Sequence, residues 1–509
     1  MKTKDLFSIA IAGLVFFTGC ASEDTANKQT EQEPSTEGLT GFVEEVPATR
    51  TTAEYDGSGL NFYWTAGDRM WVNNGGTLTQ DAYNNIGSKL ENNPANSSAV
   101  QRAAKAKFWF SGTFTASSYP VRYTGKNGVA DKVTIKASQT QTIPNDASHI
   151  ATDGDFGVAT ATKPAGGTQY HFTLDHKAAY ITFMPYTNQG VVAGAKIQKI
   201  RVFTGNASDA LAGTFDLADD GTLSNPASTL NSVELTVPNF SIPSTSTYAT
   251  NAATMVVNPG TYSNVSIEYT LYDPVTTMAG TITKTYPSVT FTAGKNKKVS
   301  TDLQVKVYSQ DRYYTWDAAI GWHYWYGHLD SDGKPDGNYP QNSSDPRWYR
   351  EDASLPFPAA NRSAKDCPNV NECIWYCAQG DPHWDDELWA TLGHLYRGGM
   401  WFKKKAKIPG FTDSNYNGTD YRLINTNFTS TSVTHGKPTN LNDYFYLPAL
   451  GSYDRGTALN VGIHGLYWSS TPHPWTNPNA HSLCFGSGSV DVSYSYGGRY
   501  CGHGLWRAE

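Results

Sequence analysis

Short runs of β-branched and aromatic residues, separated by clusters of Gly, Asn, Pro and Ser, fill residues 51–308 and constrain the fold more than any other feature. The runs include 133–136, 180–184, 199–203, 265–269 and 289–291. Each run is long enough for one strand, and no long helical pattern lies between them. Strands at this spacing predict β-sandwiches, and the length of this part allows two small ones.

The composition changes at about residue 309. Of the 14 tryptophans, 11 lie after this point, and so do nine of the 12 histidines. A separate module is therefore expected in residues 309–509. Within it, Leu388, Leu392 and Leu395 are spaced 4 and 3 apart in the run 384–395, which predicts a helix. The acidic residues Asp381, Asp385, Asp386 and Glu387 would then stabilise the helix start.

The last part of the chain has the pattern of a β-hairpin. Leu483 and Phe485 alternate with polar residues, and a second alternating run, 489–494, follows the turn Gly486-Ser487-Gly488. A closing strand near Cys501 would lie beside this hairpin, so that Cys484 and Cys501 could face each other. The module holds five cysteines, all expected outside the cytoplasm, and disulfides are expected there. Cys484 with Cys501 is the first choice, and Cys367 with Cys373 or Cys377 is the second, with one thiol left over.

These residues, together with the segment Trp468-Ser469-Ser470 and the earlier run Asp366-Cys367-Pro368-Asn369, resemble the C-type-lectin-like fold of Bacteroidetes and Fibrobacter surface proteins. The resemblance covers residues 309–509 and implies a mixed α+β module. The Glu-Pro-Asn, Gln-Pro-Asp and Trp-Asn-Asp signatures of calcium-dependent lectins are absent from the sequence. The resemblance therefore implies the fold but neither sugar nor calcium.

The N-terminus has the pattern of an export signal. Lys2 and Lys4 precede an apolar run, 6–17, that is too short to span a bilayer and is followed by Cys20. The segment Phe17-Thr18-Gly19-Cys20 is similar to a bacterial lipobox, in which the cysteine becomes lipid-modified. Residues 1–20 are therefore expected to be a lipoprotein signal peptide, with Cys20 as the anchor in the outer membrane. An ordinary secretory signal with an incidental cysteine is the alternative.

Residues 21–50 are polar and predict a disordered tether. Beyond them, several motifs resemble, in order, the fimbrillin family of Bacteroidetes pilins over residues 46–308. They are Arg50-Thr51, Trp64…Gly67-Asp68…Trp71-Val72, Tyr119-Pro120-Val121, Gln139-Thr140-Gln141 and Phe172-Thr173-Leu174-Asp175-His176. In that family an arginine-specific protease cuts the lipidated precursor and removes the first strand of the N-terminal domain. The resemblance implies cleavage between Arg50 and Thr51, after which the opened groove accepts a strand of another fimbrillin subunit. Alternatively, Arg50 is one more linker arginine.

The expected fold class is thus mainly β, with two tandem fimbrillin-type β-sandwich domains followed by a mixed α+β C-type-lectin-like domain. The boundary between the sandwiches is placed near residue 168 on the family resemblance. The expected ranges are 1–20 for the signal peptide, 21–50 for the tether, 51–168 and 169–308 for the two sandwiches, and 309–509 for the lectin-like domain.

Composition and motifs exclude several classes of function. The formal net charge is −7, and the sequence contains no basic stripe. Both observations argue against nucleic acid as a partner. Cys373, Cys377 and His383 form an incomplete zinc ligand set, so a metal site is not expected. The two C-terminal cysteines are too far apart for the copper chemistry of the formylglycine-generating enzymes, which share the lectin-like fold. The sequence shows no nucleophile motif and no phosphate loop, and neither catalysis nor a cofactor is expected.

The class of function that remains is recognition of a ligand or partner at the protein surface. The proline-flanked loop 471–478 presents Trp475, which suits stacking on a sugar or burial at a protein interface. The candidate ligand-binding residues are His473, Trp475, Asn477, Tyr494, Tyr496 and Arg499.

The expected function is a fimbrial tip adhesin, first anchored in the outer membrane and then part of an extracellular fimbrium. Its partners would be other fimbrillin subunits and a surface glycan or protein ligand. A tip position is expected because a chain that ends in a folded module cannot easily donate its C-terminus. The alternative is a non-polymerising cell-surface glycan-binding lipoprotein, which intact Arg50-Thr51 in cells would favour. An enzyme on the lectin-like scaffold would need a cluster of carboxylates or thiols that the sequence does not display.

Overall fold

A computed structural model describes residues 35–45, 52–92, 100–331, 333–425, 427–496 and 498–507. These residues are mainly β, as expected, and helices are few and short among them. The helical segments are α1 (Ile150–Asp153), α2 (Gly190–Ala193), α3 (Tyr248–Asn251), α4 (Val370–Gln379), η1 (Gly87–Lys89), η2 (Gln310–Arg312), η3 (Lys405–Lys407) and η4 (Leu441–Asp443). None of the described helices has the length and apolar character needed to cross a membrane.

The first sheet has nine strands. In spatial order they are β5 (Thr77–Gln80), β4 (Trp71–Asn74), β8 (Ser118–Tyr123), β11 (Gly157–Thr162), β12 (Tyr170–Phe172), β1 (Thr40–Glu44), β7 (Lys107–Phe110) and β6 (Tyr83–Asn84), with β13 (Asp175–His176) paired to β11. Strand β1 falls inside the range predicted to be a disordered tether, and that prediction is wrong for residues 40–44. Successive side chains of a strand point to opposite faces of the sheet, so this segment places both Phe42 and Glu44 against the core.

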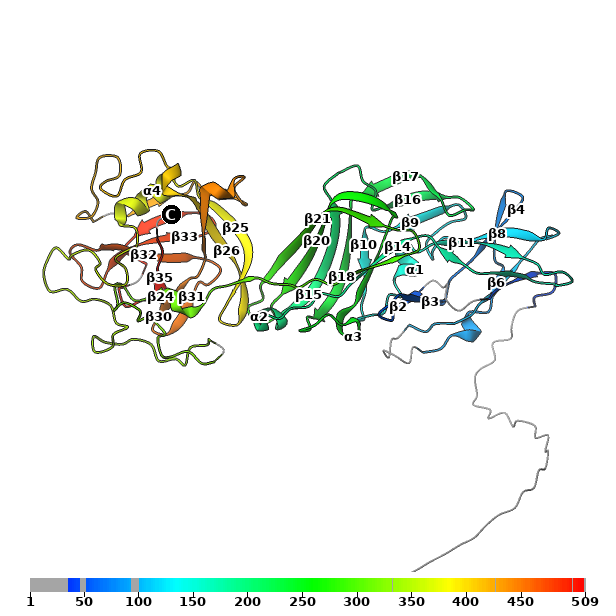
Figure 1. Ribbon diagram of the computed structural model, residues 1–509, viewed down its shortest axis with the longest axis horizontal. Helices are drawn as coiled ribbons and strands as arrows, with labels where there is room; N and C mark the ends of the chain where they lie inside the picture. Colours follow the sequence, from blue (N-terminus) through cyan, green and yellow to red (C-terminus); the bar gives the residue numbers. More distant parts are fainter. Residues whose placement is uncertain are drawn as a thin grey trace, which may run out of the picture. The chain divides into compact units, whose positions relative to one another are not determined.

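The second part consists of three smaller sheets. The largest has the order β10 (Ser138–Thr140), β18 (Ser232–Ser241), β15 (Lys196–Thr204), β20 (Gly260–Tyr272) and β21 (Ala279–Phe291), which lie side by side in Figure 1. The others are β19 (Ala253–Val257), β14 (Ala179–Phe183) and β22 (Asn296–Val299), and then β17 (Leu223–Leu230), β16 (Ala212–Leu217) and β9 (Lys132–Ile135). A separate hairpin joins β2 (Thr52–Tyr55) to β3 (Leu60–Tyr63).

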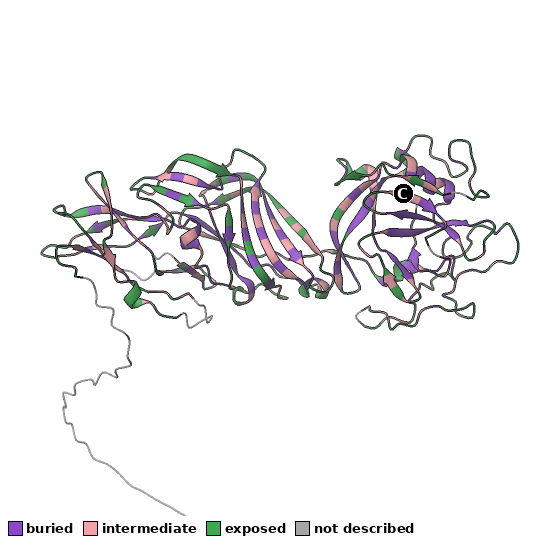
Figure 2. Ribbon diagram, turned by 180° about the vertical axis from the view of Figure 1, so that it is seen from behind, coloured by how far each residue is buried: buried purple, intermediate pink, exposed green. Residues whose placement is uncertain are grey.

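Strand β15 shows how the sequence sets this sheet. Its residues Ile197 and Ile200 are three positions apart, yet both are buried, because the register shifts at Gln198 and restores the alternation after one extra residue. Figure 2 shows the resulting stripes of buried and partly exposed residues along the strands of this sheet.

The sandwiches do not divide at residue 168. Strands β9 and β10 precede that position but pair with β16 and β18 of the second part, whereas β12 follows it and belongs to the first sheet. The chain therefore crosses to the second part and returns between β8 and β11. The core of the second part accordingly includes Val133 and Ile135.

The last part has two main sheets of its own. One has the order β23 (Lys306–Val307), β25 (His383–Thr391), β26 (His394–Lys403) and β29 (Tyr444–Pro448), with β28 (Thr434–His435) paired to β25. The other has the order β24 (Tyr313–Tyr314), β35 (His503–Gly504), β32 (Gly465–Pro472), β33 (Ala480–Phe485), β34 (Val490–Ser493) and β27 (Phe428–Ser430), and a small hairpin joins β30 (Ser452–Asp454) to β31 (Thr457–Leu459). Among the described strands, those after residue 309 pair with each other and with β23 only. We call residues 309–507 the C-terminal module.

The predicted helix at 384–395 is wrong, because these residues form the hairpin β25–β26. Leu392 and Gly393 both have positive φ, 53° and 79°, and form the two-residue turn between Thr391 and His394. The acidic residues are therefore not helix caps. Instead, Asp385 accepts a hydrogen bond from Trp401 Nε1 and Asp386 one from Trp384 Nε1, each at 3.0 Å.

The only described helix of the C-terminal module longer than one turn is α4, which was not predicted. Asn369 caps it by accepting hydrogen bonds from the backbone N–H groups of Asn371 and Glu372, while the Glu372 side chain accepts one from Asn369 N. This capping box was visible in the sequence as Asn-x-x-Glu after Pro368. The helix buries Cys373, Ile374 and Cys377 against the module core.

Candidate functional site

Strand β1 lies inside the first sheet, between β12 and β7, and carries a fully buried ring. Phe42 has no exposed surface and stacks on Tyr170 with ring centroids 4.7 Å apart. Phe110 and Phe114 meet it edge-on at 4.9 and 5.4 Å. Aromatic contacts of this kind add to the free energy of apolar burial, so Phe42 anchors β1 in the first sheet.

The backbone and one carboxylate also hold β1. The strand runs parallel to β12 and antiparallel to β7, with Phe42 opposite Tyr170 on one side and Phe108 on the other. Glu44 is buried, and its carboxylate accepts a hydrogen bond from Trp64 Nε1. Removal of β1 would leave one edge of β12 and one edge of β7 unpaired and several rings without cover, an arrangement that favours binding of another strand.

The residues predicted to mark processing cannot be placed. Cys20, Arg50 and Thr51 lie outside the described residues. Their roles as lipid anchor and cleavage site therefore stay predictions.

The structure separates the predicted ligand-binding residues into buried and exposed groups. His473 is 3% exposed and Arg499 has no exposed surface, so neither is free to meet a ligand from solution, and that part of the prediction is wrong. Trp475 and Tyr496 are 54% and 43% exposed. The amide nitrogen of Asn477 points to the carbonyl oxygen of Asp352 at 3.5 Å.

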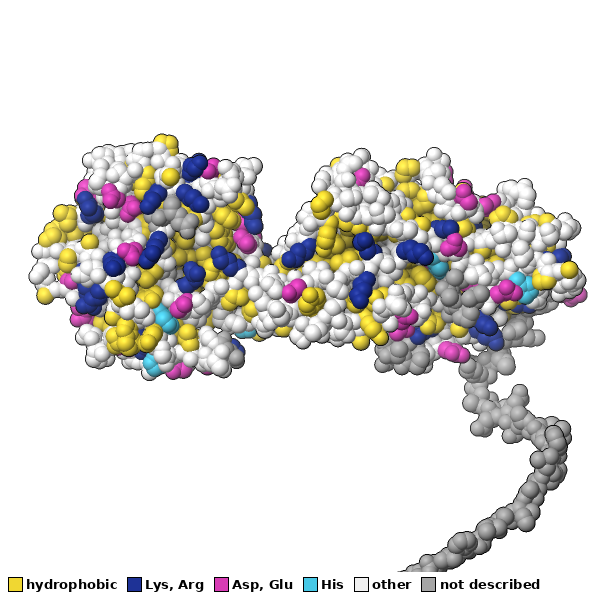
Figure 3. Space-filling model, viewed as in Figure 1, with side chains coloured by type: hydrophobic (Ala, Val, Ile, Leu, Met, Phe, Trp, Pro, Cys, Tyr) yellow, Lys and Arg dark blue, Asp and Glu magenta, His cyan; other side chains and the backbone are white. Residues whose placement is uncertain are grey.

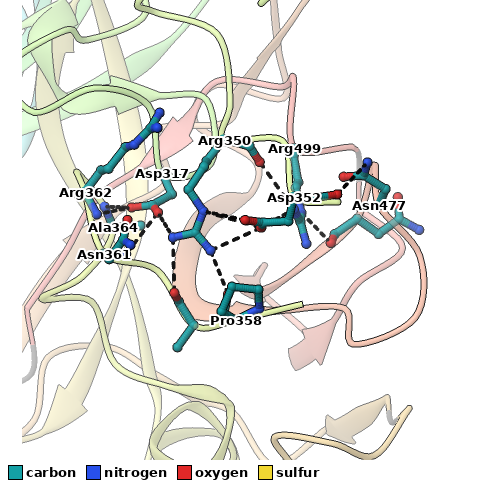
Figure 4. A network of polar contacts seen from close by, with 11 residues as sticks. Asp317, Arg350, Asp352, Pro358, Asn361, Arg362, Ala364, Asn477 and Arg499 are labelled. Atoms are coloured by element: carbon teal, nitrogen blue, oxygen red, sulfur yellow. Dashed lines mark hydrogen bonds and ion pairs between the residues drawn. The ribbon is translucent and has the colours of Figure 1, made fainter. Parts of the chain in front are cut away.

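Arg499 instead belongs to an ionic network inside the C-terminal module (Figure 4). Its guanidinium donates to the carbonyl oxygen of Asn479 at 2.9 Å and lies 3.4 Å from the Asp352 carboxylate, which also binds Arg350 at 3.1 Å. Arg350 in turn donates to the fully buried Asp317 at 2.7 Å. Burial lowers the pKa of Arg499 to about 10, and Asp352 opposes that shift.

Asp317 orders the loop that follows the network. Its two carboxylate oxygens accept hydrogen bonds from the backbone N–H groups of Asn361, Arg362 and Ala364 at 2.7–3.2 Å. Paired buried charges with several hydrogen bonds fix a loop conformation more than they stabilise a fold. We assign this network a structural role. Two arginines and two aspartates far apart in sequence gave no signal by which it could be foreseen.

The loop that carries Trp475 also carries His473, which packs against two other rings. His473 meets Tyr494 with centroids 4.6 Å apart and His481 at 6.3 Å. His481 is fully buried, and neither ring nitrogen has a hydrogen-bond partner among the described atoms. Burial, with a smaller contribution from His473, lowers the pKa of His481 to about 4, so this histidine is neutral at pH 7.

The predicted disulfides are not formed, because all five described cysteines are free and buried. Strand β33, which carries Cys484, pairs with β32 and β34, whereas β35, beside Cys501, pairs with the other edge of β32. Strand β32 thus separates the two thiols. Cys367 packs with Trp316 and Trp468, while Cys373 faces the main core of the module. Burial raises the pKa of Cys367, Cys484 and Cys501 to about 12, which makes these thiols unreactive.

Within the described parts of the chain, no group of three or more His, Cys, Asp or Glu residues is placed to hold a metal ion. Figure 3 shows one face of the molecule, on which basic and acidic side chains are interspersed over the C-terminal module with hydrophobic side chains between them.

Searches of protein-family models and of curated proteins gave no match. Among solved structures, a candidate cell adhesion protein from Bacteroides ovatus is 14% identical over 52% of this chain and 91% of its own, with a TM-score of 0.28. A fimbrial protein from the same species is 10% identical over 91% of this chain and 97% of its own, with a TM-score of 0.21. The fimbrial anchor protein Mfa2 from Porphyromonas gingivalis is 9% identical over 48% of this chain and 82% of its own, with a TM-score of 0.19. At these TM-scores the likeness assigns neither fold nor function to this chain.

Proposed function

We propose that this chain is an adhesive pilus subunit, exported as a lipid-anchored precursor and cut after Arg50. The mature subunit takes up a strand from a neighbouring subunit in place of β1. The position of β1 carries the proposal, because this five-residue strand lies inside its sheet, with a neighbour on each side, and ends six positions before Arg50. A cut at that arginine would separate the whole strand from the rest of the sheet.

The groove that β1 fills is suited to a replacement strand. Loss of β1 uncovers Tyr170 and Phe108 and leaves the inner edges of β12 and β7 unpaired. An apolar groove between two free strand edges is stabilised by any extended segment that supplies backbone hydrogen bonds and one well-placed ring. The donor would be a related pilin subunit, and assembly would move the protein from the outer membrane into an extracellular fimbrium.

The C-terminal module is proposed to be the adhesive head at the tip. Residues 503–506 are part of this module, since β35 pairs with β24 and β32, and Trp506 packs in the core and donates to the carbonyl oxygen of Trp468 at 3.1 Å. These residues are therefore occupied and are not free to serve as a donor strand. A subunit that accepts a strand and donates none from this segment fits the end of a polymer.

Immunogold labelling of the cells that make the protein tests the assignment. With antibody against the C-terminal module, we expect gold at the ends of fimbriae, and a strain carrying Arg50→Ala should lose this labelling while it retains the precursor in the membrane. Gold along the whole shaft would contradict the tip position.

The alternative function is a glycan-binding lipoprotein that never polymerises and keeps β1. Its supporting observation is the depth at which Phe42 and Glu44 are held in the sheet. Uncut protein on cells without any labelled fimbriae would favour it.

A further inference from the structure

The C-terminal module contains a pocket that is separate from the loop of Trp475. Its volume is about 260 Å³. The residues that line it are Tyr324, Tyr339, Pro340, Gln341, Trp348, Arg455 and Tyr500. Four of the seven are aromatic, and Tyr339, Trp348 and Tyr500 are only partly buried, so these rings are open to solvent.

A buried arginine holds one wall of this pocket. Arg347 is 4% exposed and donates to the carbonyl oxygens of Asn338 at 2.7 Å and Tyr324 at 3.3 Å. Its guanidinium also pairs with Asp345 at 2.7 Å. Arg347, which precedes Trp348, thereby ties its own segment to the backbone just before Tyr339, so the two rings are ordered before a ligand arrives.

A tight turn forms the opposite wall. Arg455 and Gly456 have φ of 47° and 80° and make the two-residue turn between β30 and β31. Gly456 N donates to the hydroxyl oxygen of Tyr324 at 3.0 Å, and a Cβ at position 456 would lie 2.8 Å from the ring of Tyr339. The turn therefore packs directly on two of the pocket rings and carries Arg455 at its tip.

Arg455 is the one charged residue that lines the pocket, and two carboxylates, Asp454 and Glu351, lie just outside the lining. Arg455 is exposed and makes no ion pair among the described residues, while Asp454 beside it has one carboxylate oxygen that is buried without a hydrogen-bond partner in that same part of the chain. Glu351 accepts a hydrogen bond from Trp348 Nε1 at 2.9 Å and adds a second negative charge near the ring. These two carboxylates offset the charge of Arg455, so the pocket has no net positive charge that would select an anionic ligand.

We infer that this pocket binds one neutral pyranose residue of a glycan, stacked on Trp348 and Tyr339, with Gln341 and Arg455 donating hydrogen bonds to its hydroxyl groups. The flat apolar face of a pyranose matches an aromatic ring, and its hydroxyls need donors at the edge of that ring. The volume lies just below the roughly 300–1,000 Å³ of pockets for drug-sized ligands, which suits a single sugar ring. This inference names the ligand of the head in the proposed function and rests on its adhesive role.

The test is binding of the purified soluble chain to a glycan array and then calorimetry with the best neutral oligosaccharide, alongside the matching uronic acid and a proline-rich peptide. We expect binding to glycans that end in a neutral hexose or N-acetylhexosamine. Trp348→Ala should weaken it at least about tenfold and Arg455→Gln several-fold. Trp322→Ala is the matched control, because this tryptophan is exposed in the same module but does not line the pocket, and the substitution should leave affinity unchanged.

Circular dichroism of each variant checks the fold, and Arg455→Gln is informative even if Trp348→Ala fails to fold, because Arg455 is exposed. The inference is overturned if no neutral sugar binds, if the uronic acid or the peptide binds more tightly, or if Trp322→Ala weakens binding as much as Trp348→Ala does. The assay uses soluble protein and needs no assembly. Failure here thus leaves the pilus assignment standing, and failure of the labelling experiment leaves the sugar site standing.

Discussion

Replacement of Phe42 by alanine tests how β1 is held. The side chain is fully buried and touches three aromatic rings at 4.7–5.4 Å, so its loss leaves a cavity in the core. Phe→Ala substitutions at such sites cost about 3–5 kcal/mol. Once the chain is cut after Arg50, β1 is held by non-covalent contacts alone. At about 1.4 kcal/mol per tenfold change, Phe42→Ala should weaken its retention roughly 100- to 5,000-fold.

The assay uses the purified chain, cut with an arginine-specific protease, with a fluorescent label near the start of the N-terminal segment. Fluorescence anisotropy follows release of the segment into an excess of unlabelled peptide 36–50. Val43→Ala is the matched control, because Val43 lies on the same strand but is only partly buried and loses two methyl groups. Equal release from the Phe42 and Val43 variants would refute the view that Phe42 anchors the strand.

Two further predictions concern the C-terminal module. The folded-state pKa of His481 is about 4, below the unfolded value of about 6.5, so the unfolded state binds a proton first as the pH falls. The free energy of unfolding should therefore keep its full value above pH 6.5 and drop by up to about 3 kcal/mol by pH 4. Urea unfolding at pH 7 and pH 5 should show this loss, and it should be smaller in His481→Leu; a variant with the same acid sensitivity would assign the loss to other groups. Arg350→Met leaves the buried Asp317 carboxylate without its cation and should cost about 3–5 kcal/mol in thermal unfolding. Adding Asp317→Asn should restore part of that stability, and a strictly additive double variant would mean that the two residues do not interact.

Sequence patterns predicted the elements whose structure depends on residues close together in the chain. The hairpin of β33 and β34 was predicted from the alternation around Leu483 and is confirmed, with the predicted turn 486–488 inside the observed connection 486–489. The mainly β character was predicted from the spacing of short apolar runs and is confirmed as well. Both signals depend on a period of two residues, which the sequence shows directly.

The failures have physical causes that a local pattern does not contain. The leucines near 388 have helical spacing, but a positive φ at Leu392 turns the chain back at that point, and side chains on both faces of β25 are buried. The sandwich boundary was misplaced because β9 and β10 pair with strands about 80 to 100 residues later. Strand β1 was missed because five residues in a polar stretch gave too little pattern, and its partners lie more than 60 residues away.

The candidate sites were harder to predict than the fold. Arg499 has the chemistry of a ligand-binding residue, but its guanidinium is buried and bound to residues 350–352 and 479 inside the module. The pocket of Tyr339 and Trp348 is assembled from segments near residues 324, 340, 455 and 500, so no single motif contains it. Only the high aromatic content of the module pointed toward a binding surface.

We propose that β1 occupies its groove only until the chain is cut and assembled. Mass spectrometry of the protein recovered from purified fimbriae tests this through its N-terminal peptide and through crosslinks to β7 and β12. We expect a mature chain that begins at Thr51, lacks residues 40–44, and is crosslinked at those two strands to a different subunit. A fimbrial protein that still carries residues 40–44 in covalent continuity with Thr51 would contradict it.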